Sequence, residues 1–535
     1  MLVVSVGCDR QRTVEYPVTD TVIEWMSVYK VTFSDTATVV EGNFYGWPGD
    51  EIRIPASEFR LRGASDGAEY KLCGTPAAAD TVYARIPDNW TVPFSLVFEP
   101  LKEEETSFDL LCRNDAVKGI ATKERKSRYV TVIEGILVDR PNTSRIILNP
   151  YDSDPRVNPF ISIPVEDGKF RYELKSDVRT VYELLCWDDY CHGAWYSQNI
   201  FSDNGKVSLT VRPQSFDSTV REITVDETTT VLNGKYLESG DVIYTGSNGT
   251  DLRALQDRLS AELDSLYDND LYFNEEYMAL EDSVETFGYT DDLMNRLFKM
   301  SFSGEGLSEA GHANRDRQAD LYSEIQENTI RYCEENTDEV GYFLMVDNYL
   351  RLEYIPYPTD SVRTAYRNLF EAVYAKEYAD HPFTEKMYHA IAAEDIRPGG
   401  HYTDFSAPDL SGKMHTLSDE ISGKVAVIDL WASWCGPCRR HSMALIPIYE
   451  EYKDKGFTVV GVARENNNTD AMKAALEKDG YPWLNLVELN DAGRIWPKYG
   501  AGNGGGRIIL VAADGTIVAV DPTDEEILSY LQRTL

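Results

Sequence analysis

The sequence predicts a multidomain chain with two N-terminal β-sandwich-like domains, a helical region and a C-terminal α/β domain. Apolar residues alternate with polar ones in short runs before residue 231, and recur every three or four residues between about 240 and 395. After residue 424 they form continuous runs. The 535 residues have room for about three or four domains. The expected segments are an N-terminal leader and linker (1–20), a β-rich domain (21–127), a second β-sandwich-like domain (128–238), the helical region (239–396) and the α/β domain (397–535).

Acidic residues dominate the charge of the chain. The 89 Asp and Glu residues exceed the 52 Lys and Arg residues, for a formal net charge of −37. Such a surface repels phosphate backbones, so nucleic acid is not expected as a partner. No apolar run approaches the roughly 20 residues that a membrane-spanning helix requires.

Alternating runs in the first half of the chain are typical of half-buried strands. Thr38–Tyr45 and Phe94–Phe98 show the pattern in the first β-domain. In the second, Ile161–Val165 and Phe170–Leu174 flank Asp167-Gly168, a dipeptide that favours a hairpin turn.

A helical period replaces the alternation after Asn248-Gly249-Thr250. One stripe repeats at helical spacing over Leu252, Leu255, Leu259, Leu263 and Leu266, and a second over Val362, Tyr366, Leu369 and Val373 behind a Thr359-Asp360-Ser361 cap. We interpret both stripes as packing surfaces. Arg397-Pro398-Gly399-Gly400 then reads as a linker.

The last segment alternates strands and helices. Val425–Trp431 and Phe457–Val462 are apolar enough to be strands buried on both faces, and a helix is expected from about Pro437. A hairpin around Asp514-Gly515 and a closing helix over Asp524–Leu535 complete the domain.

The motif Cys435-Gly436-Pro437-Cys438 lies where the first buried strand meets its helix. Two thiols at this spacing can close a disulfide across the first helical turn. Free backbone N–H groups and the helix dipole lower the pKa of Cys435 below the free value of about 8.5. Its thiolate can attack a partner disulfide, and Cys438 can resolve the mixed disulfide. Pro437 suits the first turn, where its missing N–H has no consequence.

Residues Asp429–Cys438 resemble the active-site strand and loop of thioredoxin. From about Ile396 onward the chain resembles the membrane-anchored, extracytoplasmic TlpA/ResA-like thiol-disulfide oxidoreductases. The resemblance implies a thioredoxin-like fold, with Cys435 as nucleophile, Cys438 as resolving thiol and Asp429 as a buried proton relay. Trp431 and Trp434 match aromatic residues that surround the site. The dithiol is itself the redox centre, so no metal or organic cofactor is expected.

The same resemblance implies the partners. These are protein dithiols and disulfides as substrates, and a membrane thiol-reducing system as electron donor. That the protein reduces its clients rather than oxidises them is expected from the resemblance to the family alone.

Three positions depart from the family pattern. Gly506 stands where the family has a cis-proline facing the disulfide, which puts client docking and exclusion of metal from the dithiol in question. His441 and Met443 stand where the family usually has glutamate and proline. We interpret His441 as a solvated helix residue, with tuning of the Cys438 pKa as the alternative.

The N-terminal segment, which ends Val6-Gly7-Cys8, resembles the end of a bacterial lipoprotein signal. Cys8 would be the lipidated residue, anchoring the chain to a membrane without spanning it. The order of domains likewise resembles multidomain lipoproteins of anaerobic Gram-negative bacteria labelled TlpA-family disulfide reductases. A location in the periplasm or cell envelope follows from these resemblances.

Zinc binding is an alternative function of the Cys435 and Cys438 pair. Zinc needs four ligands, and the nearest candidates for the other two, Cys186 and Cys191, belong to another predicted domain. Cys186 and Cys191 lie in an expected hairpin and could form a structural disulfide, and so could Cys73 and Cys112. For each pair, a disulfide and two free thiols fit the sequence equally well. The alternative function is a non-enzymatic envelope lipoprotein that binds protein or glycan, with a vestigial dithiol.

Overall fold

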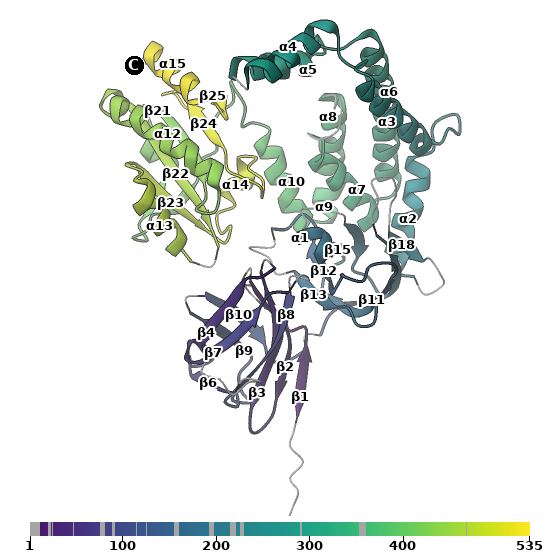
Figure 1. Cartoon of the computed structure of the whole chain (residues 1–535), viewed down its shortest axis with the longest axis vertical. Helices are drawn as coiled ribbons and strands as arrows, with labels where there is room; N and C mark the ends of the chain where they lie inside the picture. Colours follow the sequence, from purple (N-terminus) through teal and green to yellow (C-terminus); the bar gives the residue numbers. More distant parts are fainter. Residues whose placement is uncertain are drawn as a thin grey trace, which may run out of the picture. The chain divides into compact units, whose positions relative to one another are not determined.

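A computed structural model gives the fold of the chain (Figure 1). It describes residues 11–535 apart from 20–22, 24, 47, 75–80, 88–90, 114, 125, 155–159, 192–196, 214–220, 225–228, 289–290, 353–359 and 467. The chain forms two compact units, Met1–Thr230 together with Tyr388–Leu535, and Val231–Met387. Each is described by itself below.

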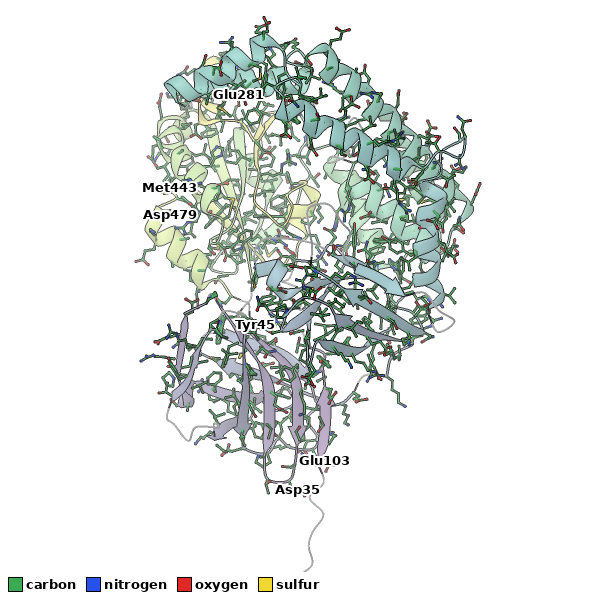
Figure 2. The ribbon with its side chains drawn as sticks, turned by 45° about the vertical axis from the view of Figure 1, so that its right-hand side comes forward. Asp35, Tyr45, Glu103, Glu281, Met443 and Asp479 are labelled. Atoms are coloured by element: carbon green, nitrogen blue, oxygen red, sulfur yellow. A yellow bond between two sulfur atoms is a disulfide. The ribbon has the colours of Figure 1, made fainter. Side chains whose placement is uncertain are left out.

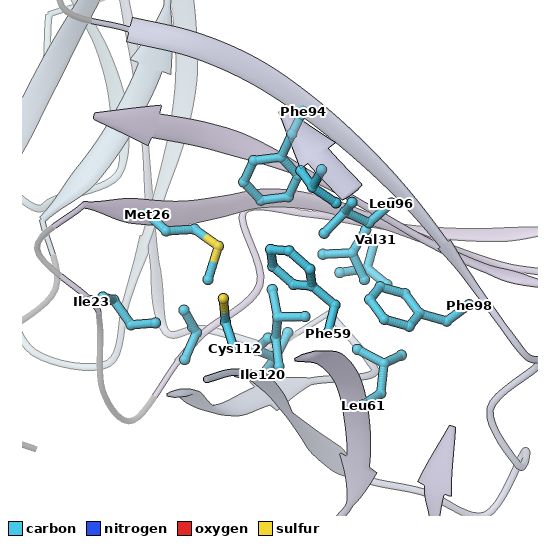
Figure 3. Packing of buried hydrophobic residues seen from close by; sticks show 14 of the residues in the cluster. Ile23, Met26, Val31, Phe59, Leu61, Phe94, Leu96, Phe98, Cys112 and Ile120 are labelled. Atoms are coloured by element: carbon cyan, nitrogen blue, oxygen red, sulfur yellow. The ribbon is translucent and has the colours of Figure 1, made fainter. Parts of the chain in front are cut away.

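The first β-domain is built on one eight-stranded sheet. Its order is β1-β2-β3-β8-β6-β5-β9-β10, and β4 pairs with β7 beside it. Phe94, Leu96 and Phe98 pack with Phe59 and Cys112 from the other half of the sheet in a single hydrophobic core (Figure 3). The strands are β1 (Arg12–Glu15), β2 (Met26–Phe33), β3 (Thr38–Tyr45), β4 (Glu51–Pro55), β5 (Phe59–Gly63), β6 (Glu69–Gly74), β7 (Thr81–Arg85), β8 (Thr91–Phe98), β9 (Ser107–Cys112) and β10 (Asp115–Ala121).

The second β-domain is a sandwich of two four-stranded sheets around a shared core. The sheet orders are β14-β11-β17-β18 and β13-β12-β15-β16. The strands are β11 (Tyr129–Leu137), β12 (Arg145–Pro150), β13 (Ile161–Pro164), β14 (Lys169–Ser176), β15 (Val181–Cys186), β16 (Gln198–Phe201), β17 (Gly205–Val211) and β18 (Arg221–Thr224).

The prediction of a hairpin around Asp167-Gly168 is wrong in one respect. The turn forms, with φ of 49° at Asp167 and 70° at Gly168, and Glu166 bridges Lys169. The flanking strands do not pair with each other, because β13 pairs with β12 and β14 pairs with β11. The tight turn therefore carries the chain from one sheet of the sandwich to the other.

The hairpin expected between Cys186 and Cys191 is also wrong. Trp187–Cys191 is a short helix, α1. Its first-turn acids, Asp188 and Asp189, lie 3.0 and 2.6 Å from Arg140 Nη2, which holds the turn in place. Neither cysteine is in a disulfide, and neither is Cys73 or Cys112.

The second unit is helical. On the first predicted stripe Leu252 and Leu259 are buried, and Asp251 caps the helix by accepting a hydrogen bond from Ala254 N. On the second stripe Tyr366 and Leu369 are buried, while Thr359 lies outside the described residues. The helices are α2 (Val231–Ile243), α3 (Leu252–Asp268), α4 (Glu275–Phe287), α5 (Asp291–Ser303), α6 (Glu309–Glu335), α7 (Glu339–Leu350), α8 (Asp360–Leu369), the π-helical η2 (Phe370–Tyr374), α9 (Ala375–Glu377) and α10 (Pro382–Ala393).

The C-terminal domain has a five-stranded sheet of order β23-β22-β21-β24-β25. β21, β22 and β23 run parallel, and β24 and β25 form the expected antiparallel hairpin. The elements are β19 (Ser406–Pro408), β20 (Met414–Thr416), α11 (Leu417–Ile421), β21 (Val425–Trp431), α12 (Gly436–Tyr452), β22 (Phe457–Glu465), α13 (Asp470–Asp479), β23 (Leu484–Leu489), α14 (Ile495–Lys498), β24 (Ile508–Val511), β25 (Ile517–Val520) and α15 (Asp524–Thr534).

Alternate residues of β21 serve two different cores. Val425 and Val427 pack with α12 and α15, whereas Ala426, Ile428 and Leu430 pack with α11 and α14. Since side chains of a strand alternate between faces, Asp429 lies on the face that α12 covers. This alternation places a carboxylate beneath the cysteine-bearing helix.

Candidate active site

Cys435 and Cys438 meet at the start of α12. Cys435 is the N-cap residue of the helix, and a disulfide joins it to Cys438. Cys438 N donates a hydrogen bond to Cys435 Sγ over 3.3 Å. In the reduced protein the same N–H, together with the helix dipole, stabilises a thiolate at Cys435. Gly436 and Pro437 occupy the first turn, and both are exposed.

The sulfur-bearing residue Cys435 is recessed. Cys435 exposes 5% of its surface, and Cys438 is half-buried. On the side of the β24 loop the neighbour of Cys435 is Gly505, where an added Cβ would lie 4.0 Å from Cys435 Sγ. Because Gly505 has no side chain, its backbone lies next to Cys435 on this side of the disulfide.

Asp429 lies beneath the dithiol with 1% of its surface exposed. Ser442 Oγ is 2.7 Å from Asp429 Oδ2 and 3.0 Å from the Cys438 carbonyl oxygen. Burial raises the pKa of Asp429 to about 7, and the hydrogen bond from Ser442 opposes part of that shift. A carboxyl group with this pKa can take or give a proton near neutral pH.

The two tryptophans contribute differently. Trp431 is fully buried, and its Nε1 donates to Asn485 Oδ1 over 3.0 Å. Gly461 on β22 makes room for this bond, because a Cβ there would lie 2.2 Å from Asn485 Oδ1. Trp434 is half-buried and lies 6.1 Å from Trp496, ring centre to ring centre. Trp431 therefore supports the sheet, while Trp434 lies beside the cysteines.

A second buried acid, Glu465, holds the loop in front of Cys435. The Ser433 backbone N and Oγ donate to its two carboxylate oxygens over 2.8 and 2.7 Å. Burial raises the pKa of Glu465, and the bonds from Ser433 act against that shift. Glu465 is 32 residues from Ser433, and the parallel register of β22 on β21 brings them together.

Arg439 fixes the same loop from the helix. Its Nη1 donates to the Ser433 carbonyl oxygen over 3.3 Å, and its Nε and Nη2 donate to Asp479 over 2.7 and 2.8 Å. Figure 2 labels Asp479 in this domain. Neither Glu465 nor Arg439 was among the predicted site residues. A buried acid at the end of a strand adjacent to the cysteine strand was the signal that could have identified Glu465.

Gly506 lies next to the disulfide. Its N–H donates to Cys438 Sγ over 3.3 Å. No peptide bond among the described residues is cis, so the loop passes the disulfide in the ordinary trans form. A Cβ at Gly506 would lie 1.6 Å from the Leu430 carbonyl oxygen, so this backbone accepts only glycine.

The other two departures are residues of α12. His441 Nε2 lies 3.0 Å from Asp524 Oδ1 of α15, so His441 is half-buried against another helix rather than solvated. Met443 is an exposed residue of α12 (Figure 2).

Within the described part of the chain, no cluster of three or more histidine, cysteine or acidic residues is arranged to hold a metal ion. No helix in the described ranges has the length and apolar character needed to cross a bilayer. Cys8, the predicted lipidation site, lies outside the described residues.

Comparisons with known proteins concern the C-terminal domain. Residues 397–530 match the family model described as Redoxin. A thiol:disulfide interchange protein DsbE from Allochromatium vinosum is 33% identical over 129 residues, which cover 23% of this chain and 67% of that relative. A thiol-disulfide oxidoreductase ResA from Bacillus thuringiensis is 28% identical over 144 residues, covering 26% of this chain and 80% of the relative.

A solved structure of the thioredoxin domain of a thiol-disulfide oxidoreductase from Bacteroides vulgatus is 28% identical, with a TM-score of 0.23, and the match covers 25% of this chain and 96% of that one. The disulfide-bonded pair at the start of α12 and the match to the DsbE relative lead to one assignment. Through its C-terminal domain, the chain belongs to the thioredoxin-like family of thiol-disulfide oxidoreductases.

Proposed function

We propose that the protein is an extracytoplasmic reductase of protein disulfides that works through the Cys435–Cys438 dithiol. The observation that carries this proposal is the position of Cys435 at the N-cap of α12, bonded to Cys438 and above the buried Asp429. The direction of electron flow rests on the resemblance to TlpA- and ResA-like proteins.

The chemistry passes two electrons from the dithiol to the client. The Cys435 thiolate attacks one sulfur of the client disulfide, which forms a mixed disulfide and releases the other client sulfur as a thiolate. Cys438 then loses its proton and attacks Cys435 Sγ. That step closes the Cys435–Cys438 disulfide and releases the second client thiolate, and both client thiolates take up protons.

Asp429 is the proposed acceptor for the proton that Cys438 loses. Ser442 lies within hydrogen-bond distance of both the carboxylate and the carbonyl of Cys438, so it provides a polar connection between them. With a pKa near 7, the carboxylate is a base strong enough to deprotonate a thiol at neutral pH without being permanently charged.

The remaining expectations concern location and partners. We propose that a lipid on Cys8 anchors the chain to a membrane of the cell envelope. A membrane thiol-reducing system then restores the dithiol, and no metal or organic cofactor takes part. The non-enzymatic alternative rested on the loss of the cis-proline, and relatives named as oxidoreductases do not favour it.

Replacing Cys435 with serine should abolish reduction of insulin by the reduced protein. The thiolate at the helix N-cap is the attacking atom, so Cys435→Ser leaves only the background rate of turbidity. Cys73→Ser is the matched control, because Cys73 is an exposed free thiol outside the C-terminal domain. Equal rates for the wild type and Cys435→Ser would refute the proposed function.

Replacing Asp429 with asparagine should stabilise the oxidised protein at pH 8 and leave its stability unchanged near pH 3. The pKa of Asp429 is raised from 3.8 to about 7 on folding, so the folded state loses stability as pH rises through this range. The full effect is up to about 4 kcal/mol, at about 1.4 kcal/mol per pKa unit. Denaturant unfolding of the C-terminal domain as a function of pH measures it.

Asp479→Asn is the control, because this substitution should change the free energy of unfolding in the opposite direction. Arg439 lowers the pKa of Asp479, so this variant loses stability at neutral pH, and the loss disappears as pH falls. A stability difference between Asp429→Asn and the wild type that does not vary with pH would contradict the raised pKa.

Replacing Cys8 with alanine in the full-length precursor should move the protein from the membrane to the soluble fraction. The acyl chains on Cys8 would supply the apolar area that holds it to the bilayer. Fractionation with a metabolic acyl label measures the change, and membrane association that persists in the variant would contradict the lipid anchor.

A further inference from the structure

The loop before β24 provides a hydrogen-bond donor to the resolving cysteine. Gly506 N lies 3.3 Å from Cys438 Sγ, and its N–H points at that sulfur. A proline at this position has no N–H and could make no such bond. The contact is therefore specific to the residue that this chain carries.

The position of this donor is set by the sheet. Leu430 N donates to the Arg507 carbonyl oxygen over 2.9 Å, which ties the loop to the last residues of β21. The loop runs so close to β21 that a Cβ on Gly506 would lie 1.6 Å from the Leu430 carbonyl oxygen. The Gly506 amide is thus held against the end of β21 before any client binds.

We propose that the Gly506 amide stabilises the thiolate of Cys438 and so makes this dithiol–disulfide couple more oxidising. The proposal rests on the proposed function, because it concerns the second sulfur of the same pair. A disulfide sulfur is a weak acceptor, whereas a thiolate carries a full charge and accepts a stronger bond. Cys438 keeps its proton in the reduced dithiol at neutral pH, so the N–H favours the reduced form over the oxidised form at a pH high enough to ionise Cys438, where it raises the reduction potential.

The consequence for the reaction lies in its second step. Cys438 loses its proton, the thiolate attacks Cys435 Sγ, and the client leaves as a thiolate. A bond from Gly506 increases the fraction of Cys438 that is ionised in the mixed disulfide. At a pH that ionises Cys438 in the reduced dithiol, it also reduces the driving force toward the client.

Other charged groups act on the same sulfur and must be held constant. Asp429 of β21 reaches the Cys438 turn through Ser442, Arg439 follows Cys438 on α12, and Tyr481 beyond α13 donates to Asp479 beside Arg439. All proteins are therefore compared in full length, at one ionic strength and at one pH high enough to ionise Cys438.

Equilibration with glutathione tests the proposal on Gly506→Pro, with Gly506→Ala as control. Either residue places a Cβ against the Leu430 carbonyl oxygen and so displaces the loop, but alanine keeps the N–H. Removing the N–H should shift the dithiol–disulfide equilibrium about tenfold toward the disulfide, equivalent to a potential about 30 mV more negative. The control should stay within about twofold of the wild type. A potential for Gly506→Pro equal to or above that of the wild type would overturn the proposal.

A measurement on the wild type covers the case in which Gly506→Pro does not fold. In the full-length protein labelled with deuterium and ¹⁵N, the Gly506 amide proton should move downfield when the reduced dithiol is titrated to high pH. Cys438→Ala should lose that movement, while the Gly504 amide should not show it. A Gly506 signal that does not respond would overturn the proposal. If the potential of Gly506→Pro and the Gly506 amide signal behave as expected but the protein does not reduce insulin, the proposed function is wrong. The hydrogen bond from Gly506 to Cys438 is then still established.

Discussion

The active site depends on the complete burial of strand β21. All seven residues from Val425 to Trp431 are buried, and they belong to cores on both faces of the sheet. A strand held in this way delivers its C-terminal end to a fixed place, where the loop 432–434 and the N-cap Cys435 follow. The same burial raises the pKa of Asp429, because a carboxylate on this strand has no water to stabilise its charge.

Around this strand, charged side chains form hydrogen bonds with the loop that leads to Cys435 instead of facing solvent. Glu465 accepts two hydrogen bonds from Ser433, and Arg439 joins the same residue to Asp479. These contacts set the path of the chain into Cys435, and so the direction from which its sulfur meets a client. Preorganisation of this kind contributes to rate because the reacting atoms need not be positioned after binding.

Local sequence patterns predicted the parts of the site that are close together in the chain. The apolar run 425–431 and the motif Cys435–Cys438 indicated a strand followed by a helix N-terminus, and both are present. The contacts of Ser433 with Glu465 depend on the register of β22 against β21, which a single sequence does not reveal. The register also decides which side chains face Asp429.

The two wrong hairpins have physical causes of the same kind. Asp167-Gly168 determines a turn, but the turn does not determine which sheet receives each flanking strand. Trp187–Cys191 is a helix whose two first-turn acids also suit a helix N-terminus, and both acids pair with Arg140, almost 50 residues earlier. In both cases the observed structure includes pairings with residues distant in sequence.

Glycine at position 506 changes the nature of the site rather than removing it. The loop still passes the disulfide, but it brings an N–H to Cys438 in place of a ring and leaves the approach to Cys435 lined by backbone.

The central claim is that Cys435 forms a covalent bond with a client sulfur, and trapping that intermediate tests it most directly. Reduced Cys438→Ser, incubated with a disulfide-bonded peptide, should accumulate a one-to-one adduct that mass spectrometry places on Cys435 and that dithiothreitol releases. The double variant Cys435→Ser with Cys438→Ser should form none. An adduct on the exposed Cys73 alone, or no adduct at all, would contradict the account.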